Sequence, residues 1–303
     1  MSDEPFLVRI ARQWGWRAYA IPVLIVLTVI ILVDIFSADG SSSGAGDETV
    51  ASQQGSGRSG PVPGKGYGDG FENGQLPPGP DYATKSSGTF KDITVVHPRV
   101  GEGTNHKVTY AVEMEDNIDA PSVGGERAFA ETVKSILSDP RGWTADPSYS
   151  FEAVPRDKEP TLLVQLAATE TTHQLCGNSL EVETSCYLSG QKEGEPGRVI
   201  VNIARWTRGA LPFQGDLGLY RQYLINHEVG HALGYAAHEP CPSDGAVAPI
   251  MMQQTLSVSN DELNSLDENE VYQRDGKTCT VNGWPYPFGA DDVVAAPTQK
   301  VRQ

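Results

Sequence analysis

Residues 226–238 read NHEVGHALGYAAH, and this stretch decides what kind of domain the chain forms. It contains His227 and His231, four positions apart, inside a segment whose apolar periodicity predicts one long helix from Asp216 to Leu233. Residues four apart on a helix lie about 40° apart around its axis, so both side chains project from the same face. Two imidazoles placed in this way can bind one zinc ion, which indicates a metal site built on the helix.

Three further residues extend this pattern. Glu228 lies about 100° around the helix from His227, close enough to reach a water on the metal without ligating the metal itself. Zinc lowers the pKa of water towards neutrality, and Glu228 is placed to take the proton and later deliver it to a leaving amine. Gly234 can adopt the left-handed conformation that ends a helix and turns the chain back. His238 follows four residues later as the predicted third ligand, so three of the six histidines lie within twelve residues.

The stretch resembles the metzincin clan of zinc peptidases, whose signature is H-E-x-x-H-x-x-G-x-x-H followed by a methionine turn below the metal. The match holds through Gly234, but Ala237 occupies the position of the third histidine and His238 comes one residue later. Either the turn after Gly234 bulges by one residue so that His238 still binds, or Glu239 or Asp244 is the third ligand instead. The resemblance implies a zincin-like fold and zinc-dependent hydrolysis of peptide bonds.

The same resemblance implies a methionine turn in the segment APIMM at residues 248–252. Met251 is the expected methionine beneath the histidines and Met252 is the second choice, while ordinary core packing is the alternative for both.

Several short motifs lie between residues 110 and 288. They are DPRGW at 139–143, NIARW at 202–206, YRQY at 220–223, NHEVGH at 226–231, CP at 241–242 and MQQT at 252–255. Together they are similar to a family of exported, membrane-anchored actinobacterial zincin-like domains for which no substrate is established. This second resemblance implies the fold and the export of the domain, and it implies no particular reaction.

The remaining sequence supplies the elements of a domain at residues 89–290. Alternating apolar residues predict strands at 108–114, 149–154, 161–167 and 198–203. Apolar residues at helical spacing predict a helix at 126–137. This order predicts an α+β, zincin-like domain in which a mixed sheet packs on the long active-site helix. In zincins an edge strand near the metal pairs with the substrate backbone, so strand 198–203 or its neighbour is the candidate here, unless the strand is central in its sheet.

The chain begins with a predicted membrane anchor at residues 18–36. Its first sixteen residues carry no charge, and its nineteen residues are about the minimum for a helix that crosses a bilayer. Three arginines precede it, and no Lys or Arg follows before Arg58. The positive-inside rule therefore places residues 1–17 in the cytoplasm and the rest of the chain outside. A cleaved signal peptide with Ala38-Asp39-Gly40 as its cleavage site is the alternative.

Export would place the four cysteines in an oxidising compartment, where disulfides form. Cys176 and Cys186 bracket a short segment and suit a hairpin. A bridge between Cys241 and Cys279 would pin the loop that carries His238. Cys241 as a zinc-bound thiolate is the alternative.

The formal net charge of −16 disfavours nucleic acid as a partner, because an acidic surface repels phosphate backbones. Residues 37–88, rich in Gly, Ser and Pro, predict a flexible low-complexity linker, and residues 291–303 predict a disordered tail. Tyr235 and Tyr286 are candidates to stabilise an oxyanion, with packing as the alternative.

The sequence as a whole predicts an extracytoplasmic zinc metalloendopeptidase. One N-terminal helix holds it in the cell membrane, and it acts on a peptide, protein or cell-wall peptide substrate. Two alternatives remain: a catalytically inactive, zinc-stabilised binding module at the cell envelope, and a cell-wall amide hydrolase.

Overall fold

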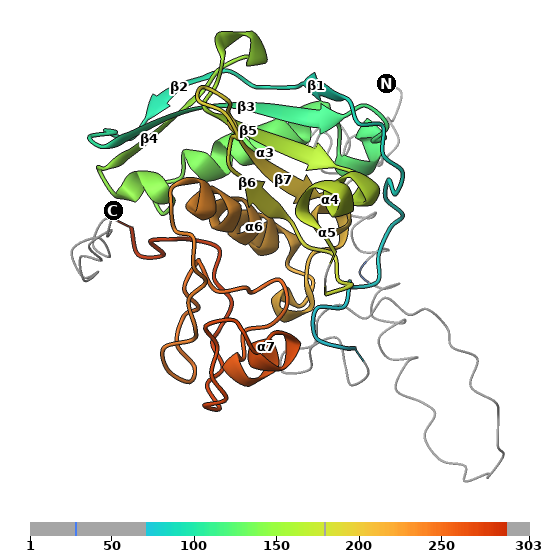
Figure 1. Cartoon of the computed structure of the whole chain (residues 1–303), viewed down its shortest axis with the longest axis vertical. Helices are drawn as coiled ribbons and strands as arrows, with labels where there is room; N and C mark the ends of the chain where they lie inside the picture. The colour runs from blue at the N-terminus through green and yellow to red at the C-terminus, as the bar shows by residue number, and fades with distance from the viewer. Residues whose placement is uncertain (1–27, 29–70, 179, 290–303) are drawn as a thin grey trace, which may run out of the picture. The chain divides into compact units, whose positions relative to one another are not determined.

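The computed structural model describes Thr28, residues 71–178 and residues 180–289 (Figure 1). All of these except Thr28 belong to one compact unit, Ser59–Gln303. The predicted cytoplasmic segment, the tail at 291–303 and, apart from Thr28, the predicted anchor at 18–36 lie outside the described residues. Among the residues that are described, no helix is both long enough and apolar enough to cross a membrane.

Seven strands form one mixed sheet in the order β2-β4-β3-β5-β7-β6, and β1 pairs with the second half of β3. Strand β3 is parallel to β4 and β5, and β5 is parallel to β7, while the other pairs are antiparallel. The predicted mixed sheet is therefore confirmed. The strands are β1 (Phe90–Asp92), β2 (His97–Val100), β3 (His106–Glu115), β4 (Tyr149–Ala153), β5 (Leu162–Ala167), β6 (Cys186–Leu188) and β7 (Gly197–Asn202).

Between residues 71 and 289, the described part of the domain has five α-helices: α3 (Glu126–Leu137), α4 (Thr169–Cys176), α5 (Ile203–Arg208), α6 (Leu217–Ala232) and α7 (Asn260–Leu266). Short 3-10 helices lie at Ala120–Val123, Trp143–Ala145, Arg156–Lys158 and Leu211–Phe213. The long helix α6 begins where the Asp216 side chain accepts a hydrogen bond from the backbone N–H of Leu219 at 2.9 Å. This cap satisfies one of the N–H groups that a helix start leaves free.

The main core lies between the sheet and the helices α3 and α6, which pack side by side against the sheet (Figure 1). Period-two alternation sends every second side chain of β3, β5 and β7 into this core. Phe129 of α3 meets Trp206 of α5 edge to face, with ring centroids 4.7 Å apart. Each large apolar side chain buried here stabilises the fold by roughly 1.5–3 kcal/mol. The predicted packing of a long helix on the sheet is thus confirmed.

A second, smaller cluster follows α6 and is called the satellite core below. Its buried members are Cys241, Ala248, Met252, Leu256, Leu263, Tyr272 and Cys279. Apart from the short helix α7, the described chain in this region forms no regular strand. Isolated β-bridges, such as Val247–Thr280, link its segments. The Cys241–Cys279 disulfide crosses it.

Both predicted disulfides are confirmed. Cys176–Cys186 joins the end of α4 to β6 with Cα atoms 5.8 Å apart, and Cys241–Cys279 spans 5.7 Å. No cysteine of the chain is free, and all four lie in the described part. The alternative of Cys241 as a thiolate ligand is therefore wrong, because its sulfur is bonded to Cys279.

Residues 71–88, which the sequence predicts to be linker, contact the domain before the predicted start at residue 89. The fully buried Arg205 donates to the backbone carbonyl of Gly74. At the end of β3 the buried carboxylate of Glu115 accepts from the backbone N–H groups of Ser87 and Gly88 at 2.7 and 3.0 Å. A glycine- and proline-rich composition does not reveal these contacts, since they involve the backbone.

The predicted strand 198–203 corresponds to β7, which lies between β5 and β6. Both of its edges are hydrogen-bonded, so it is central and offers no edge to a substrate. Its neighbour β6 is the last strand on that side and is antiparallel to β7. Of β7 and this neighbour, β6 is therefore the one with an open edge in the described part of the chain.

Candidate metal centre

The structure brings His227, His231 and His238 together. One nitrogen of each ring lies within 4.8 Å of the corresponding nitrogens of the other two, which makes a group that could hold a metal ion. The ring centroids are 4.8 Å apart for His227 and His231, and 5.5 Å apart for either of these and His238. His227 is buried and the other two are half-buried. The two helical histidines come from α6, and His238 comes from the loop that follows it.

Each imidazole has its Nδ1 atom occupied. Nδ1 of His227 lies 2.9 Å from the carbonyl oxygen of Ile250, and Nδ1 of His231 lies 2.8 Å from that of Tyr235. Nδ1 of His238 lies 3.2 Å from a carboxylate oxygen of Glu270. Carbonyl and carboxylate oxygens only accept hydrogen bonds, so each Nδ1 carries a proton and, in the neutral form of each ring, Nε2 keeps a free lone pair. Such outer partners are the usual companions of metal-binding histidines.

These residues fit zinc by donor type and number. Imidazole nitrogens are common zinc ligands, and His227, His231 and His238 would hold the ion. Burial, and then the neighbouring imidazoles, hold the pKa of His227 well below its ordinary value, and burial also lowers the pKa of His231. Both rings are therefore neutral near pH 7, as metal binding requires.

The turn after α6 explains how a histidine one residue late reaches the site. Gly234 adopts a left-handed φ of 102°, and the backbone N–H of Tyr235 donates to the carbonyl of Gly230 at 3.1 Å. The helix ends there and the chain reverses. The added residue, Ala237, lies exposed in the turn, where an extra residue meets no packing constraint.

The two alternative third ligands lie outside the cluster of three histidines. A carboxylate oxygen of Asp244 accepts from the backbone N–H of Thr278 at 3.1 Å, which commits it to the satellite core. Glu239 follows His238 directly, and burial raises the pKa of its carboxyl group. Of the three candidates, the structure brings only His238 to the other histidines.

Met251 packs against α6 at Gly230. A β carbon placed on Gly230 would lie 2.5 Å from the Met251 sulfur, so the methionine sits directly on the helix backbone. The preceding residue, Ile250, holds His227 through its carbonyl oxygen. Met252 instead lies in the satellite core, and its carbonyl oxygen accepts from the Tyr223 hydroxyl at 3.0 Å. The structure thus places Met251, rather than Met252, against Gly230 of α6, and its role beneath the histidines stays a prediction.

Glu228 is 4% exposed, and burial raises the pKa of its carboxyl group to about 8. It directly follows His227 on α6 and precedes His231 by three positions. A divalent cation at the histidines would favour the ionised carboxylate and so oppose the effect of burial.

An aromatic cluster supports the loop that fixes His231. The indole N–H of Trp143 donates to the carbonyl of Asn226 at 3.0 Å, and Tyr235 stacks on Trp143 with centroids 5.0 Å apart. The hydroxyl groups of Tyr235 and Tyr149 are 2.9 Å apart. Tyr286 meets Trp143 edge to face at 6.3 Å. The two tyrosines suggested as oxyanion donors are therefore both part of this packing, and the Tyr235 hydroxyl already has a partner.

The structure also reveals residues that the site pattern does not indicate. Trp143 belongs to the DPRGW motif, which carries a family resemblance but no site role by itself. Glu270 lies 32 residues after His238 and has no spacing signal that connects it to a histidine.

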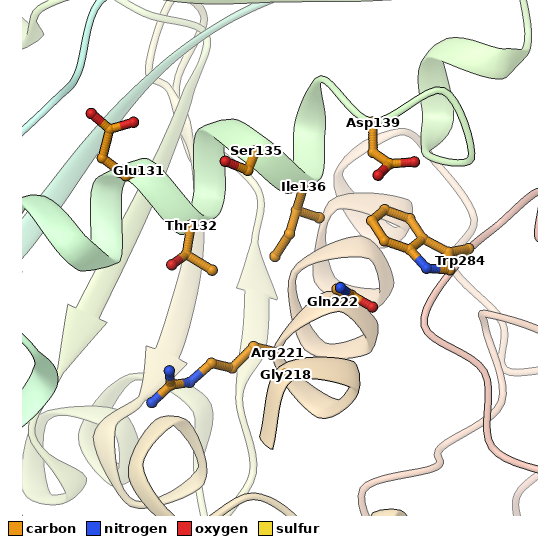
Figure 2. A pocket seen from close by; sticks show the side chains of 9 residues that line it. All are labelled: Glu131, Thr132, Ser135, Ile136, Asp139, Gly218, Arg221, Gln222 and Trp284. Atoms are coloured by element: carbon orange, nitrogen blue, oxygen red, sulfur yellow. The ribbon is translucent and has the colours of Figure 1, made fainter. Parts of the chain in front are cut away.

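A groove of about 380 Å³ lies between α3 and α6 (Figure 2). Its lining comprises Glu131, Thr132, Ser135, Ile136, Asp139, Gly218, Arg221, Gln222 and Trp284. The positions that α6 contributes to it lie on the side of the helix opposite His227 and His231, since residues repeat every 3.6 positions. None of the three clustered histidines lines the groove, so it is separate from the candidate metal centre.

A helix and its following turn thus present three histidines to one point on a mixed α/β domain, which defines a candidate three-histidine metal site. The model of one protein family, described as "Protein of unknown function (DUF3152)", matches residues 76–287, and the chain belongs to this family. No curated protein and no solved structure shows significant similarity to the chain.

Proposed function

We propose that the domain is a zinc-dependent peptidase that hydrolyses peptide bonds outside the cell membrane. The observation that carries the proposal is the convergence of three imidazoles whose Nδ1 atoms are all bonded to acceptors. A structural zinc site is usually closed by four protein ligands, whereas three histidines leave one position open for water or substrate. The donor set therefore favours catalysis over a purely structural ion.

When bound, zinc would supply Lewis acidity, which acidifies water and polarises a carbonyl oxygen. The chain itself supplies the rest. The acceptors Ile250, Tyr235 and Glu270 orient the three rings and, in the neutral rings, leave the free lone pair on Nε2. Glu228 serves as the general base that takes a proton from the attacking water and as the acid that returns it to the leaving amine. Its buried position keeps bulk water from competing for that proton.

Strand β6 is the proposed platform for the substrate backbone. It is one edge strand of the sheet and contacts α6, the helix that carries two of the histidines. An extended peptide can add to such an edge by main-chain hydrogen bonds. The Cys176–Cys186 bridge ties the strand to α4 and fixes the edge. A cell-wall peptide would use the same edge and chemistry as a protein.

A second function also has an observation in its favour. Two ligands lie on α6 in the main core, and the third lies in the loop that leads to the satellite core. A zinc ion here would therefore join two otherwise separate clusters, as in a zinc-stabilised binding module without catalysis. Glu228 separates the two functions, because hydrolysis needs its carboxylate and a structural ion does not.

The test is the zinc content of the full-length chain, purified in detergent without chelator and measured by elemental mass spectrometry. His227→Ala and His238→Ala are compared with His97→Ala, a histidine of β2 outside the cluster. We expect one zinc per chain in the wild type and in His97→Ala, and loss of zinc in the two site variants. Wild-type protein without zinc would refute the metal centre.

Activity is then assayed on unfolded protein and on cell-wall peptides. We expect Glu228→Gln to keep its zinc and lose hydrolysis. Hydrolysis that survives this substitution would remove Glu228 from the mechanism. A zinc-loaded wild type without activity on either substrate class would favour the binding module.

A further inference from the structure

The third histidine is fixed by a different kind of partner from the other two. His227 and His231 are carried by the regular helix α6 and bond to backbone carbonyl oxygens. His238 lies in a loop, and its Nδ1 bonds to the side chain of Glu270 at 3.2 Å. Its ring can turn when that carboxylate is absent, whereas the backbone acceptors cannot be removed by substitution.

The loop that carries Glu270 is itself firmly placed. Two residues further on, the buried Tyr272 enters the satellite core. Its hydroxyl accepts from the backbone N–H of Gln253 at 2.9 Å, and its carbonyl oxygen accepts from the Asn264 side chain at 3.0 Å. The Tyr272 ring also lies nearly parallel to the His238 ring, 23° from it, with centroids 6.5 Å apart. One loop thus contacts both the edge and the face of the imidazole.

The backbone around His238 is held without Glu270. The N–H of Glu239 donates to the carbonyl of Met251 at 3.1 Å. Cys241 exchanges two hydrogen bonds with the Asn260 side chain, at 2.8 and 3.1 Å, and is bonded to Cys279. Removal of the Glu270 carboxylate therefore frees the imidazole ring and leaves the loop in place.

We propose that Glu270 is the positioning residue of the third ligand: it holds the His238 ring with its free nitrogen towards the other two histidines and thereby sets the zinc affinity. The inference rests on the proposed zinc site. Glu270 touches neither zinc nor substrate and acts through His238. Loss of such an outer partner typically weakens metal affinity about 10–100-fold.

The test measures zinc affinity of the full-length chain by competition with a chromophoric chelator. Glu270→Gln keeps the shape of the side chain but replaces its charged acceptor with a neutral amide oxygen, which accepts the Nδ1–H of His238 more weakly. Glu268→Gln is the matched control, because this substitution removes the same charge from the same loop. The Glu268 side chain is 78% exposed, and its carboxylate lies 3.6 Å from the guanidinium of Arg274. We expect zinc affinity to fall about 10–100-fold in Glu270→Gln and to stay near the wild-type value in Glu268→Gln.

Two further readouts separate positioning from general stability. The melting temperature of the zinc-free protein should be the same for Glu270→Gln and the wild type. The visible spectrum of the cobalt-substituted protein should change in Glu270→Gln but not in Glu268→Gln, since only the former holds the His238 ring less firmly.

Equal zinc affinity in Glu270→Gln and the wild type would overturn the inference while leaving the metal centre intact. An equal loss in both glutamine variants would also overturn it, because loop charge would then be the cause. A lowered melting temperature of zinc-free Glu270→Gln would make the residue structural and overturn it as well. A wild type that binds no zinc would refute the proposed function itself, and the inference with it.

Discussion

Gly230 offers a sharp test of how Met251 and Trp143 pack against α6. A β carbon there would lie 2.5 Å from the Met251 sulfur and 2.9 Å from Cζ2 of Trp143, and real β carbons do not approach other atoms so closely. Both neighbours are buried, so Gly230→Ala must displace one of them. Overpacking of this kind costs about 1–3 kcal/mol. The alanine recovers up to about 1 kcal/mol of helix propensity, so the net change in unfolding free energy is a loss of roughly 0–2 kcal/mol.

Gly218→Ala, on the same helix, is the matched control. Its β carbon would meet only a carboxylate oxygen of Asp216 at 3.4 Å, an ordinary contact, so the propensity gain is kept. The two variants should differ by about 1–3 kcal/mol, or roughly 2–12 °C in melting temperature for a domain of this size. Thermal unfolding of zinc-free protein measures the difference. Zinc content should also fall in Gly230→Ala alone, because a displaced Met251 moves the neighbouring Ile250 carbonyl that orients His227. Equal stability and equal zinc content in both variants would refute the close packing of methionine and helix.

Three further outcomes are expected. Burial acts to raise the pKa of Glu115, but hydrogen bonds from a hydroxyl and three backbone N–H groups lower this pKa overall. The ionised carboxylate of Glu115 therefore stabilises the fold above the unfolded-state pKa of about 4.3, and this stabilisation is lost as the pH falls through the folded-state pKa. In pH-dependent unfolding, the stability gap between wild type and Glu115→Gln should narrow from about pH 5 towards pH 3, and a constant gap would contradict this. Replacement of Cys241 and Cys279 by alanine removes a bridge across 38 positions, worth about 4 kcal/mol in the chain-entropy model, and should also weaken zinc binding. A chain that lacks residues 71–81 loses the Gly74 carbonyl that accepts from the buried guanidinium of Arg205. Its unfolding free energy, measured with denaturant, should be about 1–3 kcal/mol lower than that of a control chain that begins at residue 71.

The long elements of the fold could be predicted from the sequence because their signals are local. The helix predicted at 126–137 has the bounds of α3, and the one predicted from Asp216 to Leu233 includes α6 with both of its caps. The four predicted strands correspond to β3, β4, β5 and β7, in which apolar and polar residues alternate or the whole segment is buried. Strand β6 was not predicted, because three residues carry no period and only its pairing with β7 defines it. Helix α4 contains three threonines and little apolar surface, so its pattern is equally weak.

The residues of the candidate site also divide into those with a local sequence signal and those without one. The two helical histidines follow from their spacing, and His238 follows from the turn that Gly234 permits. The contact of Glu270 with His238 joins residues 32 positions apart, and the contact of Trp143 with Asn226 joins residues 83 positions apart. Neither separation leaves a pattern in one sequence, because the fold alone brings these residues together.

The two disulfides brace the parts of the candidate site that secondary structure supports least. Strand β6, the proposed edge for substrate, has only three residues and one hydrogen-bonded neighbour, and Cys186 within it is bonded to Cys176. The loop after His238 leads into a satellite core with a single short helix, and Cys241 there is bonded to Cys279. The histidines on α6 need no such support, because their helix is packed into the main core. The disulfides therefore brace mainly the proposed substrate edge and the loop of His238, so we expect the proposed site to be most stable in a compartment where disulfides persist.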